Sequence, residues 1–406
     1  MPRARGWYVT PWSVLVGCAL GAACGRLAGG GGESSATPRT LDNADVKSMS
    51  VDIRRDEKTI CPWGGVQMAV FAKVVLPGGD RPVELETPGG SEKAADKLMA
   101  WGEFAFHSEQ GTFGEGGQFT PNRDLLVTAA EPFKIKTVYK KRPDKFTFET
   151  SYPPDYACIE AVGFEGPSGS SGQSGSSGQS GQSASSNTNT PGGSGGDGAN
   201  GGSGGPGGDG GRGPEVEAYA TFVKTPFYEK LVAVVAISGG EKKLALFDPD
   251  GPVKVYAAGG SGGGGGSGGG GGSGGPGGSG SPGGAGGKGG DGGGGGSGGK
   301  GGAGGSLVLV FDKRFPELES LVEVSAPGGG GGGAGSGGFG GSGGQYGSGW
   351  STAAAGSPGP GGNQGPGGQS GSPGSGGSAR KRAGEVAKRF ADLPGITPLG
   401  KKGKGK

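Results

Sequence analysis

The sequence has few of the residues that enzymes use for nucleophilic or metal chemistry. Its 406 residues include a single histidine, His107. Any Ser-His-Asp or Cys-His arrangement would have to use His107, and a His-rich metal site is excluded. His107 stands beside Ser108 in a segment of strand character, where adjacent side chains point to opposite faces. We therefore expect no enzyme activity, no catalytic residues, no cofactor and no metal.

Hydrophobic residues are also scarce, at 30% of the chain, whereas glycine occupies 108 positions and proline 29. Glycine and proline together make up about a third of the residues, which is typical of collagen-like or low-complexity chains. One continuous globular core is therefore excluded, and a compact two-domain enzyme is disfavoured.

Cysteine occurs only four times, and no Cys-x-x-Cys is present, so neither a zinc ribbon nor a thioredoxin-type site is supported. Cys18 and Cys24 lie in the apolar N-terminus, while Cys61 and Cys158 bracket the best candidate for a globular segment. For an exported chain we expect Cys61 and Cys158 to form a disulfide. Two unpaired thiols in a cytosolic chain are the alternative.

The N-terminus predicts export. Arg3 and Arg5 precede a short apolar run that is too brief to span a bilayer, which is typical of a signal peptide. The run ends Leu-Val-Gly-Cys at Cys18, which resembles the lipobox of bacterial lipoproteins, and Cys24 is a second candidate. The resemblance implies a lipidated cysteine that anchors the chain to the bacterial outer membrane or cell surface. Ordinary secretion and a chain that is not exported are the alternatives.

Residues 45–164 hold most of the large hydrophobic side chains, and these alternate with polar ones at 66–74, 133–139 and 146–150. Such alternation is typical of half-buried strands, and Pro-Gly and Pro-Asp turns between the runs favour a β-sandwich over βαβ units. Trp101, Gly111 and the stretch 117–121 (Gly-Gln-Phe-Thr-Pro) resemble a line of bacterial immunoglobulin-like domains. The resemblance implies a core tryptophan, glycines in turns, and a cysteine pair that bridges the two sheets.

Three glycine-rich tracts keep a strict three-residue phase. Glycine recurs every third residue at 166–181 and 192–213, at 259–304, and at 329–347 and 356–377. From 259 to 304 there are sixteen triplets, and fifteen of them also have glycine at the second position; the exception is Gly-Ser-Pro at 280–282. If 280–282 is a turn, the tracts divide into six segments of similar length.

A period of three fits a left-handed helix with three residues per turn and one edge without side chains. Proline is too rare for collagen, so we expect a polyglycine II bundle within one chain, about 55 to 75 Å long. The tracts resemble the Gly-Gly-x bundles of some phage tail-fibre tip adhesins and of a glycine-rich antifreeze protein. A disordered spacer and a collagen-like trimer are the alternatives; otherwise we expect a monomer.

Two apolar inserts, 216–258 and 307–327, separate the tracts, and neither can bury enough surface to fold alone. We expect them to pack on each other as a small α+β cap at one end of the bundle. Asp248, Asp250 and Asp312 suggest calcium, but no EF-hand spacing is present, and turn formation explains the first two.

The last residues, 379–406, contain nine Lys or Arg against two acidic residues. Val386, Phe390 and Leu393 recur at roughly helical spacing, which predicts a short cationic amphipathic helix. Such a tail suits contact with an anionic envelope component, whereas nucleic-acid binding is not expected because interleaved aromatic residues are absent.

These observations predict a mainly β protein. Its expected parts are a signal peptide (1–17), a tether (18–44), an immunoglobulin-like sandwich (45–164), glycine tracts (166–215, 259–306, 328–378), a β insert (216–258), a β-α-β insert (307–327) and a basic tail (379–406).

The predicted function is a lipid-anchored, non-enzymatic envelope protein, a structural or adhesion module that presents loops on the glycine bundle to an unknown surface ligand. Phe339, Tyr346 and Trp350 are the binding candidates. The alternative is a carbohydrate- or protein-binding sandwich with the tracts as a disordered spacer.

Overall fold

The computed structural model describes residues 38–54, 58–89 and 94–400. Cys18, Cys24, the signal peptide and most of the tether lie outside these residues. The described part is mainly β, as the sequence predicts. Its helices are short: α1 (Leu125–Thr128), α2 (Leu318–Leu321) and the 3-10 turns η1 (Ala95–Lys97), η2 (Trp101–Glu103), η3 (Glu115–Gly117) and η4 (Ala387–Arg389).

The N-terminal part contains two antiparallel sheets that share one core. In the first sheet β2 pairs with β1, β3 and β6, and β6 pairs with β5; the second has the order β4-β7-β8. The strands are β1 (Asp45–Ile53), β2 (Val66–Val75), β3 (Pro82–Glu86), β4 (Phe104–His107), β5 (Gly111–Phe113), β6 (Gln118–Pro121), β7 (Phe133–Tyr139) and β8 (Thr147–Tyr152). Met68, Phe119 and Phe133 are completely buried between the sheets. The alternation in the sequence thus places every second side chain of these strands in the core.

The predicted disulfide is present: Cys61 and Cys158 are bonded, with their Cα atoms 6.0 Å apart. Both cysteines lie in loops, Cys61 between β1 and β2 and Cys158 after β8. The bond therefore joins the loop before β2 to the loop between β8 and β9 (Ala161–Glu165). Trp101 is half-buried and lies against the turn at Gly117, whose positive φ of 72° suits glycine.

The inserts form a second β-rich unit, which we call the head. One sheet has the order β12-β11-β10-β14-β16, with β17 also paired to β10, and the other has the order β15-β13-β9. The strands are β9 (Ala161–Glu165), β10 (Glu215–Lys224), β11 (Leu231–Ser238), β12 (Glu241–Phe247), β13 (Val253–Ala258), β14 (Ser306–Asp312), β15 (Val322–Ser325), β16 (Ser378–Gly384) and β17 (Thr397–Pro398).

The head differs from the expected cap because both flanks of the inserts join it. Residues 161–164, which the sequence placed in the sandwich, belong to β9, which pairs in parallel with β13. The predicted amphipathic helix in the tail is wrong: 378–384 form β16, an edge strand parallel to β14. Val386 and Phe390 are fully buried in the core of the head. These apolar side chains help to cover β10 and β11, whose long runs of buried residues need neighbours on both faces.

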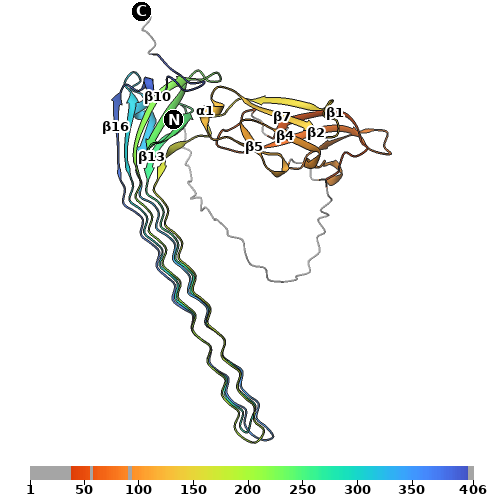
Figure 1. The fold of residues 1–406 in the computed structure, drawn as a ribbon, viewed down its shortest axis with the longest axis vertical. Coiled ribbons are helices and arrows are strands. Elements are labelled where there is room, and N and C mark those ends of the chain that lie inside the picture. The colour runs from red at the N-terminus through yellow and green to blue at the C-terminus, as the bar shows by residue number, and fades with distance from the viewer. Residues whose placement is uncertain (1–37, 55–57, 90–93, 401–406) are drawn as a thin grey trace, which may run out of the picture. The chain divides into compact units, whose positions relative to one another are not determined.

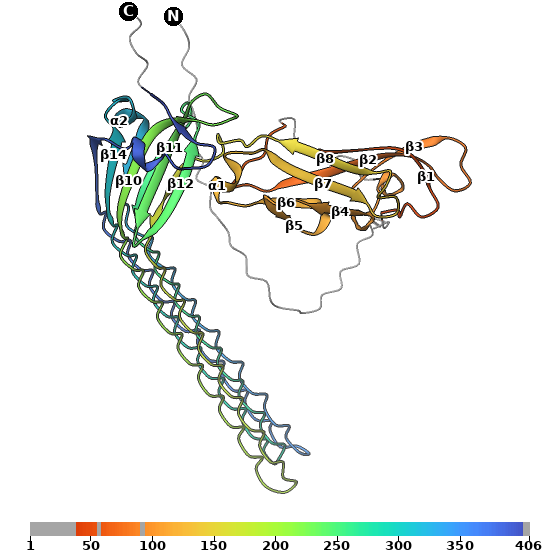
Figure 2. The ribbon, with the colours of Figure 1, turned by 45° about the horizontal axis from the view of Figure 1, so that its top comes forward.

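Six glycine-rich segments extend from the head side by side (Figures 1 and 2). We number them 1 (166–187), 2 (192–213), 3 (259–280), 4 (283–304), 5 (328–349) and 6 (356–377). Segments 1, 3 and 5 leave β9, β13 and β15, and segments 2, 4 and 6 return to β10, β14 and β16. Each segment thus continues the direction of a strand, so the parallel strands of the head establish the first contacts of the segments.

Backbone hydrogen bonds join the segments in two rows, 1-3-5 and 2-4-6. Within a row the chains are parallel: Gly169 donates to Ser261 in segment 3, and Gly262 donates to Gly330 in segment 5. Between the rows the chains are antiparallel, for example from Gly263 in segment 3 to Gly208 in segment 2. These bonds repeat every three residues with N–O distances of 2.7 to 3.2 Å. The phase in the sequence is therefore the repeat of the hydrogen-bond pattern.

The two central segments, 3 and 4, each have four neighbouring segments, and this explains their second glycine. A Cβ added to Gly265 would lie 2.0 Å from a backbone oxygen of segment 4, and one added to Gly266 would lie 1.9 Å from a backbone oxygen of segment 1. A Cβ at the third position, Gly264, would meet nothing closer than 3.8 Å. Segments 1 and 6 have only two neighbours each, and their sequences require glycine only at every third residue.

Candidate functional site

The end of the bundle away from the head carries two exposed aromatic side chains. Tyr346 is 52% exposed and Trp350 is 43% exposed. They lie at the end of segment 5 and in the connection to segment 6. The loop residues there, 184–191, 279–282 and 345–355, include no charged side chain and are rich in serine, threonine and asparagine. This surface, which we call the tip, therefore combines aromatic rings with uncharged hydrogen-bonding groups.

Hydrogen bonds between the loops hold the tip together. Trp350 donates its backbone N–H to Gly280 at 2.8 Å, and Ser281 donates to Thr190 at 3.0 Å. Asn187 donates to Ser279 at 2.9 Å. Each of the three connections is thus bonded to another, so the aromatic side chains project from a cross-linked base.

Phe339, the third binding candidate, does not join the other two. It is 78% exposed but lies midway along segment 5 rather than near its end. It occupies the third position of its triplet, beside Gly270 of segment 3, whose added Cβ would lie 3.7 Å from the Phe339 carbonyl oxygen. The predicted binding residues therefore divide into a pair at the tip and a single ring on the side of the bundle.

The bundle has two different faces. We call the third-position residues of segments 2 and 4 the charged face, because all charged residues of the six segments are there: Asp197, Asp209, Arg212, Lys288, Asp291 and Lys300. The third-position residues of segments 3 and 5 form the neutral face. Its serines are neighbours, since Ser336 Oγ lies 3.2 Å from Ser267 Oγ and Ser342 Oγ lies 3.1 Å from Ser273 Oγ.

On the charged face, acidic and amide side chains accept hydrogen bonds from the backbone of the next segment. Asp197 Oδ1 accepts from the N–H of Lys288 at 2.7 Å, and Asp209 Oδ1 accepts from the N–H of Lys300 at 2.7 Å. These N–H groups belong to third positions, which have no backbone partner in the bundle. The side chains thus satisfy donors that the glycine pattern leaves open. The signal of this pairing in the sequence is the presence of acidic and amide residues at third positions, but the pattern does not show which N–H groups they bond.

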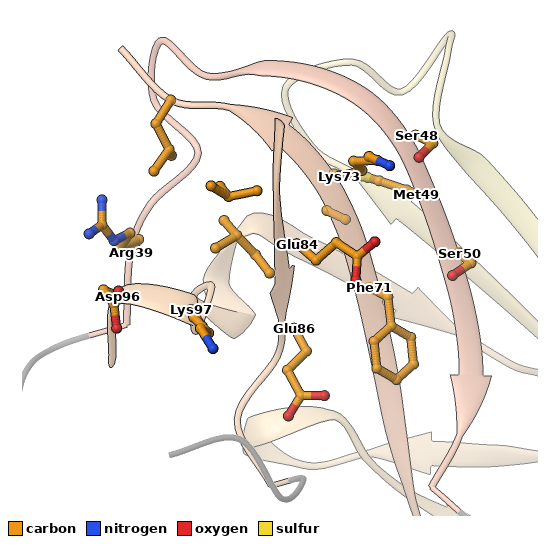
Figure 3. A pocket seen from close by; sticks show the side chains of 14 residues that line it. Arg39, Ser48, Met49, Ser50, Phe71, Lys73, Glu84, Glu86, Asp96 and Lys97 are labelled. Atoms are coloured by element: carbon orange, nitrogen blue, oxygen red, sulfur yellow. The ribbon is translucent and has the colours of Figure 1, made fainter. Parts of the chain in front are cut away.

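The two sheets of the N-terminal part, which we call the sandwich, have a broad cleft of about 970 Å³ over β1, β2 and β3. Figure 3 shows Phe71 and the carboxylates of Glu84 and Glu86 along it, with Ser48 and Ser50 on the adjacent strand. Phe71 is 40% exposed. Arg54 pairs with Glu86 at 3.5 Å, so part of the wall is neutralised. The cleft combines an exposed ring with mixed charges and is a second candidate surface.

The suggested calcium ligands are used within the fold. Asp312 is 1% exposed and pairs with Arg314, whose Nη2 lies 2.6 Å from Oδ2, while Thr221 donates to the same oxygen at 2.8 Å. Burial raises the pKa of Asp312, but the hydrogen bonds from Arg314 and Thr221 outweigh it and hold the pKa below its ordinary value. Asp248 Oδ1 accepts from the backbone of Asp250, which is a turn contact. Among the described residues no cluster of three metal-ligating side chains occurs.

His107 ends β4 and is exposed, and Lys136 is its partner across the strand pair. The basic residues of the tail are partly engaged: Arg382 pairs with Glu217 at 3.5 Å, and Arg389 lies over the ring of Tyr219 at 4.5 Å. Less positive charge is therefore free for an anionic partner than the sequence suggests.

Within the part of the chain that the structure describes, no helix has the length and apolar character to cross a membrane. Comparison with protein-family models, with curated proteins and with solved structures gives no match. Function is therefore inferred from the residues and contacts of this chain alone.

Proposed function

We propose that the chain is a non-enzymatic, lipid-anchored protein of the cell envelope, a structural or adhesion module that presents the tip loops on a polyglycine II bundle. The observation that carries the proposal is the position of Tyr346 and Trp350 on hydrogen-bonded loops at the end of six mutually bonded segments. Exposed aromatic side chains that the hydrogen-bonded loops hold in place lower the solubility of a protein unless a partner covers them.

The composition of the tip favours adhesion. Tyrosine and tryptophan supply large contact areas at a small cost in side-chain entropy, and serine and asparagine add adaptable hydrogen bonds. At about 3.1 Å per residue, the segments would hold the tip about 65 Å from the head. The bundle would therefore act as a stiff spacer with a contact surface at its end.

The proposed location in the cell envelope rests on the N-terminal sequence. Lipidation at Cys18, or alternatively at Cys24, would anchor the chain in a membrane of the bacterial envelope, at the outer membrane or cell surface. The disulfide between Cys61 and Cys158 suits an oxidising compartment outside the cytosol. The basic residues of the tail that remain exposed would add contact with an anionic envelope component.

The second candidate function is ligand binding by the sandwich, taken as immunoglobulin-like, with carbohydrate or protein as ligand. The cleft with Phe71 supports it.

One binding experiment separates the two functions. Labelled full-length chain would be applied to intact bacterial cells and to a glycan array, as wild type, as the Tyr346→Ala/Trp350→Ala double variant and as Phe71→Ser. Adhesion by the tip predicts a loss of about tenfold or more in the double variant, because buried aromatic anchors dominate contact energies. Phe71→Ser should bind like wild type. The reverse result would favour the sandwich, and equal binding by all three proteins would contradict both functions.

A further inference from the structure

The neutral face has no charged side chain, whereas the opposite face carries all six charged residues of the bundle. Charged residues are normally spread over a solvent-exposed surface and are depleted at the cores of interfaces. The segregation of charge is thus the pattern of a molecule that exposes one face to water and covers the other.

The two faces also differ in their backbone groups. On the charged face Asp197, Asn200 and Asp209 accept hydrogen bonds from third-position N–H groups of segment 4. On the neutral face no described residue accepts a hydrogen bond from the N–H groups of Ser261, Ser267 or Ser273. These donors are six residues apart and repeat at about 19 Å. The neutral face therefore offers a regular row of donors beside a row of serine hydroxyls, which can act as acceptors.

Phe339 lies at the centre of this face. It is midway along segment 5, and its neighbour Gly270 is midway along segment 3. Phe339 is the most exposed of the large hydrophobic residues that the structure describes. Dominant contact residues are typically aromatic or arginine and lie near the centre of an interface.

The size of the face suffices for a stable contact. A segment is about 65 Å long at about 3.1 Å per residue, and two hydrogen-bonded backbones span about 9 Å. Segments 3 and 5 therefore present about 600 Å² from each partner, or about 1,200 Å² in total, which is the lower end of the range of specific interfaces. Row 2-4-6 is instead protected against pairing at its exposed edge. Segment 6, which forms this edge, carries Pro358, Pro360, Pro366 and Pro373, and β16, which continues it in the head, carries Arg380, Lys381 and Arg382.

We propose that a second copy of this chain docks parallel on the neutral face, related to the first by a two-fold axis that runs along the bundle. An axis midway between segments 3 and 5 places each segment 3 opposite the other copy's segment 5. Phe339 of each copy then lies over the bare Gly270 position of the other. An uncharged face with donors and acceptors at one common repeat is complementary to itself, as a two-fold contact requires. The chain is thus a paired bundle with both charged faces in water.

The test is the mass of the full chain in solution, measured by light scattering over a range of concentrations. Cys18→Ser and Cys24→Ser would be present throughout so that no lipid is attached. The expected result is a dimer. Phe339→Ser and Ser267→Glu, both on the neutral face, should raise the dissociation constant about tenfold or more, because one removes the central ring and the other buries a charge.

Two matched variants serve as controls. Tyr346→Ser removes an exposed ring at the tip, and Ser297→Glu places the same charge at a third position of the charged face; both should dimerise like wild type. Backbone hydrogen exchange would verify that every variant keeps a folded bundle. A monomer at roughly 100 μM, above the dissociation constants of weak standard-size interfaces, would overturn the proposal. Equal effects of Ser267→Glu and Ser297→Glu would also overturn it.

Discussion

At the scale of single residues, the position within a triplet decides whether a glycine is required. An added Cβ at Gly269 would lie 1.9 Å from the carbonyl oxygen of Ser176, a backbone atom that cannot move without displacing segment 1. An added Cβ at the next residue, Gly270, would be 3.7 Å from its nearest neighbour, an ordinary contact. The bundle therefore requires glycine at position 269 but not at position 270.

This difference gives a matched pair of substitutions. Gly269→Ala should destabilise the bundle by about 1–3 kcal/mol or more, as overpacking does. Gly270→Ala should be neutral or stabilise by about 0.4–1 kcal/mol, because it lowers the entropy of the unfolded chain at no steric cost. Thermal unfolding of both variants would check this. Equal destabilisation by the two variants would contradict the lattice of hydrogen bonds described above.

The buried ion pair of the head gives a second prediction at this scale. Asp312→Asn should lower stability near neutral pH by about 1–3 kcal/mol, because it weakens hydrogen bonds to a charged group. The folded-state pKa of Asp312 lies below its ordinary value of 3.8, so its contribution is complete above that pH and is lost as the pH falls through the folded pKa.

The deficit of Asp312→Asn should therefore shrink in acid. Chemical unfolding at pH 7 and at pH 3 measures it. Glu385→Gln is the control, because Glu385 pairs with Lys313 in solvent and should contribute nothing measurable. A loss of stability in Asp312→Asn that is larger at pH 3 than at pH 7 would contradict a lowered pKa of Asp312.

At the scale of elements, each segment has its own number of bonded amides. In segments 2, 3 and 4 two of every three N–H groups donate to a neighbouring segment, whereas in segments 1, 5 and 6 one of every three does so. The sequence reflects these numbers only in part. Segments 2 to 5 are all rich in Gly-Gly pairs and segments 1 and 6 are not, yet segment 5 has only one donating N–H group in every three.

Hydrogen exchange resolved by residue should therefore show a periodic pattern. In segment 4 the amides of Gly292 and Gly293 should be protected and that of Gly294 should exchange rapidly. In segment 6 a single amide per triplet should be protected by a backbone partner. A disordered spacer predicts rapid exchange at every position, so uniform loss of protection would reject the ordered bundle.

At the scale of the whole molecule, the paired strands of the head fix the register between the six segments, and the three-residue repeat maintains that register as far as the tip. Segments 1 and 2 form a hairpin in which Gly202 donates to Ser176. Deleting a whole triplet from each strand of this hairpin, 175–177 together with 201–203, keeps glycine in phase on both. Deleting Ser180 alone moves a non-glycine residue into each following contact position of segment 1.

The paired deletion should therefore retain protected amides along segments 1 and 2, while deletion of Ser180 should lose them from Gly181 outward. Hydrogen exchange measured over residues 160–213 distinguishes the two. Similar protection in both variants would mean that the phase of the glycines does not hold the hairpin.

The sequence by itself determined the mainly β class, the alternating strands of the sandwich, the three-residue phase and the turn at 280–282. These are local signals: alternation reports one buried face, and an invariant glycine phase reports close backbone contact. It also led to the disulfide between Cys61 and Cys158.

Only the tertiary structure decided which segments are neighbours, that β9 and β16 join the head, and that Val386 and Phe390 fill its core instead of facing a membrane. It also separated Phe339 from the tip and placed all charged residues of the bundle on one face. These outcomes depend on pairing between segments that are far apart in the chain. A local pattern shows that a face will be covered, but the identity of the covering partner is decided by packing.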